Sequence, residues 1–331
     1  MPAPRQRLIA ASALLIAAFA FVGCTSTAEA TPETAPAAAG YPVTVDNCGT
    51  DVTFDAAPER VLAIKSSSIE MMLALGLEDR MIGTAFPDGE YAEQWAERGT
   101  DVPLISEKVP GQEATLSLEP DLVYAGWESN VTADGAGDRE TLASLGVNTF
   151  VSPSACQEPE YQPDPLTFDD VFAEIEQVGT IFDAQDAATD LVADLQSRLD
   201  AVTPDDRGLT ALWFSSGSDT PFVGAGIGAP QMMMDAAGLT NIAEDMDETW
   251  SSLSWEVVVD ANPDVIVLVD SAWGSTVKKI GVLEANPATA SLPAVVNSRY
   301  LVVPFPAGEA GVRNVEAVES LIAQLKEIAP Q

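Results

Sequence analysis

Two stretches of this sequence share one pattern: Glu113–Tyr124 reads EATLSLEPDLVY, and Glu256–Val267 reads EVVVDANPDVIV. In each, a glutamate begins a short helical segment, Pro-Asp ends it, and an apolar run typical of a buried strand follows. A second pair lies upstream, because Ile69–Leu77 and Gln231–Leu239 are both apolar helical segments that close with a glycine, as helix C-termini often do. Since the two pairs occur in the same order, the sequence predicts a duplicated lobe.

Short apolar runs supply the strands expected in these lobes. Runs of this kind that alternate with helices indicate parallel sheets covered on both faces. They lie at Arg60–Ile64, Asp121–Ala125, Leu209–Phe214 and Asp264–Val269. We therefore expect an α/β fold of two Rossmann-like lobes with mainly parallel sheets, and a ligand outside the carboxyl ends of the strands.

A long segment between the lobes has helical spacing, with apolar positions recurring from Phe168 to Val202. Gly179 and the polar stretch that starts at Asp183 predict a break, with Asp183 capping a second helix. That helix would have about 18 residues and a length of roughly 27 Å, enough to reach from one lobe to the other. The predicted boundaries are an N-terminal lobe at 41–165, an inter-lobe helical segment at 166–204 and a C-terminal lobe at 205–331.

The composition excludes several classes of function. The chain has 331 residues, with 15 Lys and Arg against 51 Asp and Glu, and its formal charge of −36 would repel nucleic acid. Histidine is absent, which removes the usual general base and the commonest metal ligand. We expect no nucleic-acid partner, no cofactor, and no serine–histidine hydrolase, histidine-rich zinc site or histidine-held haem.

The first forty residues predict export. Arg5 and Arg7 precede an apolar run from Leu8 to Phe21, which is too short to span a bilayer permanently and is typical of a secretory signal. Cys24 follows a glycine at the end of this run, which resembles the bacterial lipobox with phenylalanine where leucine is usual. We expect a signal peptide at 1–23, lipidation of Cys24, a disordered tether at 24–40 and anchoring at the extracytoplasmic face of the cell membrane. The alternative is a plain signal peptide cut nearby.

Two cysteines remain in the body of the chain, Cys48 and Cys156. Thiols pair in the oxidising compartment of an exported protein, so we expect one disulfide between them. Two separately buried thiols are the alternative.

These features together resemble the substrate-binding lipoproteins of ABC importers for siderophores and cobalamin. The resemblance rests on the segment with Cys24, the opening Arg60–Ser68, the two Glu-to-Pro-Asp units and the long helical segment, and it covers nearly all of residues 41–331. It implies a monomeric binding protein, not an enzyme, whose lobes close on a small molecule with little hinge motion. It also implies a permease dimer with its ATPase as partner, into which Glu113 and Glu256 dock; a solvated helix face is the alternative for each glutamate.

Four further stretches carry a narrower resemblance: Gly126–Asn130, Ser152–Cys156, Val223–Pro230 and Phe305–Asn314. They are similar to a subgroup proposed to import a precursor of the deazaflavin coenzyme F-420 that lacks the polyglutamate tail. This resemblance implies a planar anionic ligand. A ferric siderophore is the runner-up, with cobalamin and haem in the same transporter class.

The candidate ligand-binding residues agree with a planar anion. Trp127, Trp213 and Trp273 fall at or near predicted strand ends, and aromatic faces favour a flat ligand, although each tryptophan could equally belong to the core. Lys65 precedes serines that can cap the next helix and present N–H groups to an anion, and Arg313 can bind a carboxylate or phosphate.

Ser66 and Ser67 are the candidates among these capping serines, and Glu128 is the candidate beside Trp127 in the stretch Gly126–Asn130. Ser215, Ser216 and Gly224 are candidates on segments expected to be loops that allow close backbone approach of a ligand, with an ordinary loop as the alternative. Trp250 and Trp255 are expected in the core or at the rim of the cleft, and Trp95 in the core. A remote alternative is an exported hydrolase that uses Ser66 with Lys65 as its base, which is disfavoured because adjacent side chains rarely point together.

Overall fold

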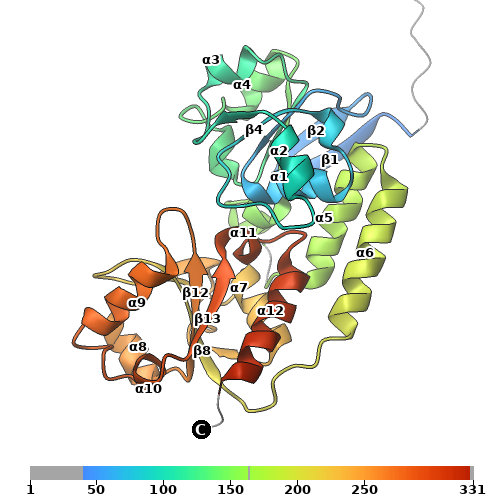
Figure 1. The fold of residues 1–331 in the computed structure, drawn as a ribbon. Coiled ribbons are helices and arrows are strands. Elements are labelled where there is room, and N and C mark those ends of the chain that lie inside the picture. Colours follow the sequence, from blue (N-terminus) through green and yellow to red (C-terminus); the bar gives the residue numbers. More distant parts are fainter. Residues whose placement is uncertain (1–39, 163–164, 329–331) are drawn as a thin grey trace, which may run out of the picture. The chain divides into compact units, whose positions relative to one another are not determined.

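The computed structural model describes residues 40–162 and 165–328, and in them two sheets form the centres of two lobes (Figure 1). The N-lobe sheet consists of β3 (Val61–Ile64), β4 (Met81–Ala85), β5 (Leu104–Ser106), β6 (Leu122–Ala125) and β7 (Asn148–Val151). Its order is β5-β4-β3-β6-β7, and every pairing is parallel. A small antiparallel hairpin, β1 (Val43–Asn47) with β2 (Thr50–Phe54), precedes it.

The C-lobe sheet repeats this plan. Its strands are β8 (Thr210–Ser216), β9 (Phe222–Gly224), β10 (Thr240–Asn241), β11 (Trp250–Ser252), β12 (Val265–Asp270) and β13 (Tyr300–Pro304). The path is β11-β9-β8-β12-β13, with β10 paired to β8. The pairings among β8, β10, β12 and β13 are parallel, whereas β9 pairs antiparallel with both β8 and β11, so this sheet is mixed.

The duplication predicted from the sequence is visible in the strand order. In each sheet the first strand lies in the middle, and the strand that follows the Glu-to-Pro-Asp unit, β6 or β12, pairs beside it. The two apolar helices with closing glycines are α1 (Ser66–Ala74) and α7 (Ala229–Ala237). Gly76 and Gly238 after them have φ of 70° and 78°, the left-handed conformation expected there.

Further helices cover the two sheets. The N-lobe carries α2 (Ala96–Asp101), α3 (Gln112–Leu116), α4 (Arg139–Ser144) and the 3-10 turns η1 (Glu78–Arg80), η2 (Glu128–Val131), η3 (Pro153–Ala155) and η4 (Pro159–Tyr161). The C-lobe carries α8 (Trp255–Ala261), α9 (Thr276–Ala285), α10 (Pro293–Val296), α11 (Phe305–Gly308) and α12 (Asn314–Glu327). No helix in these described ranges is long and apolar enough to cross a bilayer.

The predicted inter-lobe segment forms two helices packed side by side, α5 (Phe168–Ile181) and α6 (Gln185–Asp200) (Figure 1). The prediction that Asp183 caps the second helix is wrong. Asp183 has a φ of 56°, and Ala184 holds the N-cap position without a side-chain hydrogen bond. N-cap residues typically have extended backbone torsions, which a residue in the left-handed region does not have, and the helix here begins one residue later than predicted.

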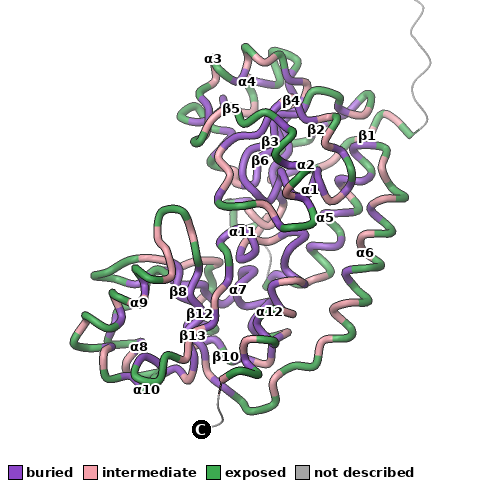
Figure 2. Tube along the Cα trace, in the orientation of Figure 1, coloured by how far each residue is buried: buried purple, intermediate pink, exposed green. Residues whose placement is uncertain are grey.

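Helices α5 and α12 bury their opposite ends in different lobes. Val171 of α5 packs in the C-lobe core, while Phe172 and the turns after it pack in the N-lobe core. Val315 of α12 packs in the N-lobe core, and Leu321 of the same helix packs in the C-lobe core. The buried trace runs through both lobes and these helices (Figure 2), and Ala37–Gln331 forms one compact unit. Burial of apolar surface therefore holds the two lobes together.

The predicted disulfide is present. Cys48, in the turn of the β1–β2 hairpin, bonds Cys156 after η3, with the two Cα atoms 5.3 Å apart. The predicted signal peptide, the tether up to residue 39 and the lipidated Cys24 lie outside the described residues.

Candidate ligand-binding site

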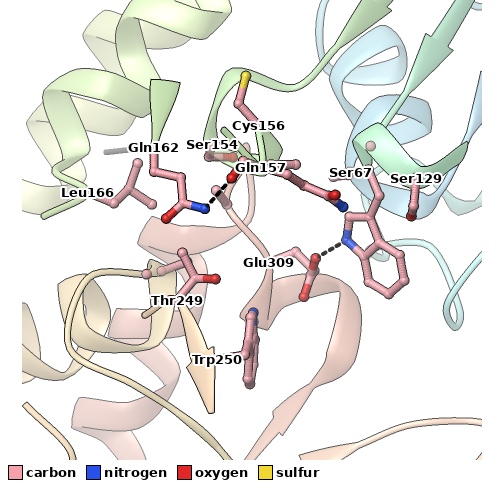
Figure 3. Close-up of a pocket in the computed structure, with 17 residues that line it drawn as sticks. Ser67, Ser129, Ser154, Cys156, Gln157, Gln162, Leu166, Thr249, Trp250 and Glu309 are labelled. Carbon is pink, nitrogen blue, oxygen red and sulfur yellow. Dashed lines mark hydrogen bonds between the residues drawn. The ribbon is translucent and has the colours of Figure 1, made fainter. Parts of the chain in front are cut away.

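A cavity of about 230 Å³ lies between the lobes, outside the carboxyl ends of N-lobe strands and against the starts of α7 and β11 and the end of α11 in the C-lobe (Figure 3). Ser67 follows β3, Trp127 follows β6 and Ser154 follows β7, while Trp250 belongs to β11 and Glu309 follows α11. The polar groups of its wall are hydroxyls and carboxamides, from Ser67, Ser129, Ser154, Gln157, Gln162 and Thr249, together with Glu309 and the two indoles. Ligands bind at this edge in open α/β sheets.

One hydrogen bond crosses the cavity from lobe to lobe. Nε1 of Trp127 donates to Oε2 of Glu309 at 2.6 Å (Figure 3). Burial raises the pKa of the Glu309 carboxyl above its ordinary value, although the positive charge of Lys65 and the indole bond oppose the rise. The bond therefore positions Trp127 and satisfies one carboxylate oxygen of Glu309.

Aromatic rings from both lobes surround Lys65. Its Nζ lies 3.4 Å from the ring centroid of Trp127, 4.7 Å from that of Phe86 and 5.0 Å from that of Phe305. Phe305 in turn contacts Trp273 edge to face, with centroids 4.6 Å apart. The ammonium is thus stabilised by cation–π contacts behind the cavity wall, not exposed in the cavity.

The carboxylate of Asp88 lies where the sequence predicts an anionic group of the ligand, next to Lys65. The Lys65 ammonium and the Asp88 carboxylate form a fully buried ion pair, and the Ser66 N–H donates to Asp88 Oδ2 at 3.3 Å. Burial lowers the pKa of Lys65 and raises that of Asp88, while their mutual attraction opposes both shifts. A ligand anion at Lys65 would have to compete with Asp88.

Arg313 is also paired inside the protein. Its Nη1 lies 3.3 Å from Oε1 of Glu70, and these side chains are 8% and 1% exposed. The Ala92 N–H donates to the same oxygen at 2.9 Å. Burial raises the pKa of Glu70 to about 7 despite the opposing charge of Arg313. Arg313 therefore lies at the lobe interface but does not line the cavity.

The other predicted ligand residues are placed differently from Ser67 and Trp127. Trp213 is fully buried inside β8, which continues to Ser216, so the expectation of a loop at Ser215 and Ser216 is wrong. Gly224 is buried against Trp213 and Pro230.

Two further candidates lie near the cavity without lining it. Trp273 is half exposed and packs on Phe305. Oε2 of Glu128 accepts a 2.6 Å hydrogen bond from the Gln157 N–H. Glu128 therefore holds a segment of the cavity wall.

Sequence reasoning did not select several residues of the cavity wall. The residues missed are Gln157, Gln162, Thr249 and Glu309. Trp250 was expected in the core or at the rim of the cleft, and it is a partly buried residue of the cavity wall. The signal for Glu309 was available, because it is the acidic residue of the stretch Phe305–Asn314, which follows the last strand of the second lobe.

The two predicted docking glutamates have equivalent positions. Glu113 and Glu256 are exposed residues in the first turns of α3 and α8, the short helices that precede β6 and β12. In the described residues no group of three or more His, Cys, Asp or Glu side chains is arranged to hold a metal ion.

Comparisons with known proteins agree with this geometry. The ABC transporter substrate-binding lipoprotein YvrC of Bacillus subtilis, itself uncharacterized, is 27% identical over 321 residues, covering 94% of each chain. A cobalamin-binding protein of Halobacterium salinarum is 29% identical over 291 residues, covering 81% of this chain and 72% of its own. A crystal structure of an ABC-type Fe3+-hydroxamate transport system from Saccharomonospora viridis superposes with a TM-score of 0.75 at 28% identity, over 86% of this chain and 99% of that one.

A model of the family described as periplasmic binding protein matches residues 61–307, which span both sheets and the cavity between them. The chain therefore belongs to the periplasmic binding protein family, and it is a binding protein, not an enzyme.

Proposed function

We propose that this protein is the substrate-binding component of an ABC importer, which captures a small molecule between its lobes and delivers it to a permease dimer with its ATPase. The observation that carries the proposal is a cavity between two duplicated lobes, lined by residues of both. The relatives named as an ABC transporter substrate-binding lipoprotein and a Fe3+-hydroxamate transport system support it. Lipidation at Cys24 would hold the monomer at the extracytoplasmic face of the membrane.

The ligand we propose is flat and conjugated, with the deazaflavin precursor of coenzyme F-420 as the leading candidate. The indoles of Trp127 and Trp250 in the cavity wall support a flat ligand. The cavity of about 230 Å³ is below the roughly 300–1,000 Å³ of sites for drug-sized ligands. It therefore suits a ring system with the rest of the ligand outside.

A ferric siderophore or cobalamin is the second candidate. It is favoured by the names of two relatives, the cobalamin-binding protein of Halobacterium salinarum and the Fe3+-hydroxamate system of Saccharomonospora viridis. A bulky corrinoid would require the lobes to lie further apart than in the structure, because the present cavity is small.

Tryptophan fluorescence tests these candidates. The purified protein is titrated separately with the deazaflavin precursor, a ferric hydroxamate and cobalamin, and we expect saturable quenching by the deazaflavin precursor. Trp127→Phe should weaken the quenching, whereas Trp95→Phe, a change in the N-lobe core, should not. Quenching by the hydroxamate or cobalamin alone would discard the deazaflavin, and no response to any of the three would contradict the proposed function.

A further inference from the structure

We infer that Glu309 sets the charge selectivity of the inter-lobe cavity: its carboxylate receives a hydrogen-bond donor or a cationic group of the ligand, so the part of the ligand that enters is neutral or positive. This inference rests on the proposed function and narrows the chemistry of its ligand. It places any anionic groups of that ligand outside the cavity.

The charge of the cavity wall is the first observation. Among the described lining residues Glu309 is the one charged side chain, and the other polar groups are neutral hydroxyls, carboxamides and indoles. An anionic group in this space would face a carboxylate without a compensating cation in the wall. Burying a charge without a partner is costly, so the wall disfavours such a group.

The buried cations Lys65 and Arg313 are already paired with other carboxylates, although the charge of Lys65 also opposes the rise that burial causes in the pKa of Glu309. Lys65 is buried against Asp88 behind Trp127, and Arg313 is buried against Glu70. Neither side chain lines the cavity. Each positive charge is therefore already matched by a carboxylate in the protein.

The geometry of Glu309 leaves room for a ligand donor. Oε2 accepts the indole N–H of Trp127, whereas Oε1 accepts no hydrogen bond from the described residues. Glu309 lines the cavity together with the indoles of Trp127 and Trp250, and it is hydrogen-bonded to the first of them. A flat ring in contact with the indoles would bring a donor on its edge toward this carboxylate, and hydrogen bonds to charged groups are the stronger kind.

The test compares two flat three-ring dyes of opposite charge, the cation proflavine and the anion anthraquinone-2-sulfonate. Binding to the full chain is measured by tryptophan quenching at 0.15 M salt, where charges beyond about 8 Å are largely screened. We expect the cation to bind at least about tenfold more tightly than the anion, the ratio that one charge-assisted hydrogen bond gives. Glu309→Gln should abolish this preference, because the amide keeps an acceptor for Trp127 but has no charge.

Glu327→Gln is the matched control, since it removes a carboxylate from an exposed position on α12 of the same lobe. This variant should bind the cationic dye in preference to the anionic dye by the same ratio as the unmodified chain. Equal binding of the dyes, preference for the anion, no binding of the cation, or a preference that persists in Glu309→Gln would overturn the inference. Because neither dye is a proposed transport ligand, this result is independent of the titrations that test the proposed function.

Discussion

Arg313 Nη1 and Glu70 Oε1 lie 3.3 Å apart and join the C-lobe to the N-lobe in a buried ion pair. Arg313 immediately precedes α12, and Glu70 lies on α1. Loss of one partner of such a pair leaves an uncompensated charge in the interior. The pair therefore favours the packed arrangement of the lobes, and Arg313 serves this interface in the structure.

Stability should fall as the pH rises from 5 to 8. Burial raises the pKa of Glu70 and of Glu174, each to about 7 from an ordinary value of 4.5. Each carboxyl thus holds its proton more tightly in the folded state than in the unfolded state. Its contribution to the free energy of unfolding is therefore complete below about pH 4.5 and is lost as the pH rises through about 7. The loss is on the order of 3 kcal/mol for each group. Urea unfolding at pH 5 and pH 8 measures it.

Two variants identify the source of this pH dependence. Glu174→Gln should flatten it, because the amide can still accept the hydrogen bond of the Tyr124 hydroxyl. Arg313→Met should steepen it, since Glu70 without its cation retains a proton to still higher pH. A chain that is equally stable at both pH values, or more stable at pH 8, contradicts the expectation.

Removal of the disulfide should destabilise the chain and loosen the cavity wall. The bond closes a loop with a sequence separation of 108 residues, for which chain entropy predicts about 4–5 kcal/mol. Cys156 also lines the cavity, so the Cys48→Ser, Cys156→Ser variant should bind ligand more weakly. Urea unfolding and a fluorescence titration check both effects. Unchanged stability in the double variant would show that the cross-link contributes nothing.

Two glycine-to-alanine substitutions should change the free energy of unfolding in opposite directions. An added Cβ at Gly224 would lie 2.4 Å from Cβ of Pro230 and 3.1 Å from Cδ1 of Trp213, so Gly224→Ala should cost about 1–3 kcal/mol. Gly281, exposed within α9, has no neighbour within 4 Å of that position. Gly281→Ala should therefore stabilise by about 0.5–1 kcal/mol. Thermal unfolding of both variants tests the pair, and equal effects would count against the packing argument.

The sequence was sufficient for the architecture because the fold depends on local patterns that occur twice. Apolar runs of strand length and helices closed by glycine identify β3, β6, β8 and β12 and the helices α1 and α7 without knowledge of distant contacts. The end of β8 was misplaced because serine at 215 and 216 suits a loop as well as a strand. Asp183 has the chemistry of a cap, but its backbone torsions exclude that role.

The cavity was less predictable, because it depends on which charges neutralise one another across the fold. Lys65 and Arg313 were reasonable candidates for an anion, and only the tertiary structure shows that Asp88 and Glu70 pair with them. Glu309 is the converse case, since its role follows from a cavity lining that contains no cation, while Lys65 behind it is paired with Asp88. Pairings between residues so far apart in sequence have no local signature.

The equivalent positions of Glu113 and Glu256 predict that changing both will impair delivery of the ligand to the permease without impairing ligand binding. Both are exposed and begin short helices outside the cavity wall. The double variant Glu113→Ala, Glu256→Ala should keep the ligand affinity of the unmodified chain and impair uptake by cells that carry the transporter, because the expected docking contacts with the permease dimer would be lost. The exposed pair Glu140→Ala, Glu327→Ala removes the same charge elsewhere and should not alter uptake. Normal uptake by the first variant would eliminate the docking role, and a loss of ligand affinity would place these glutamates in the binding step.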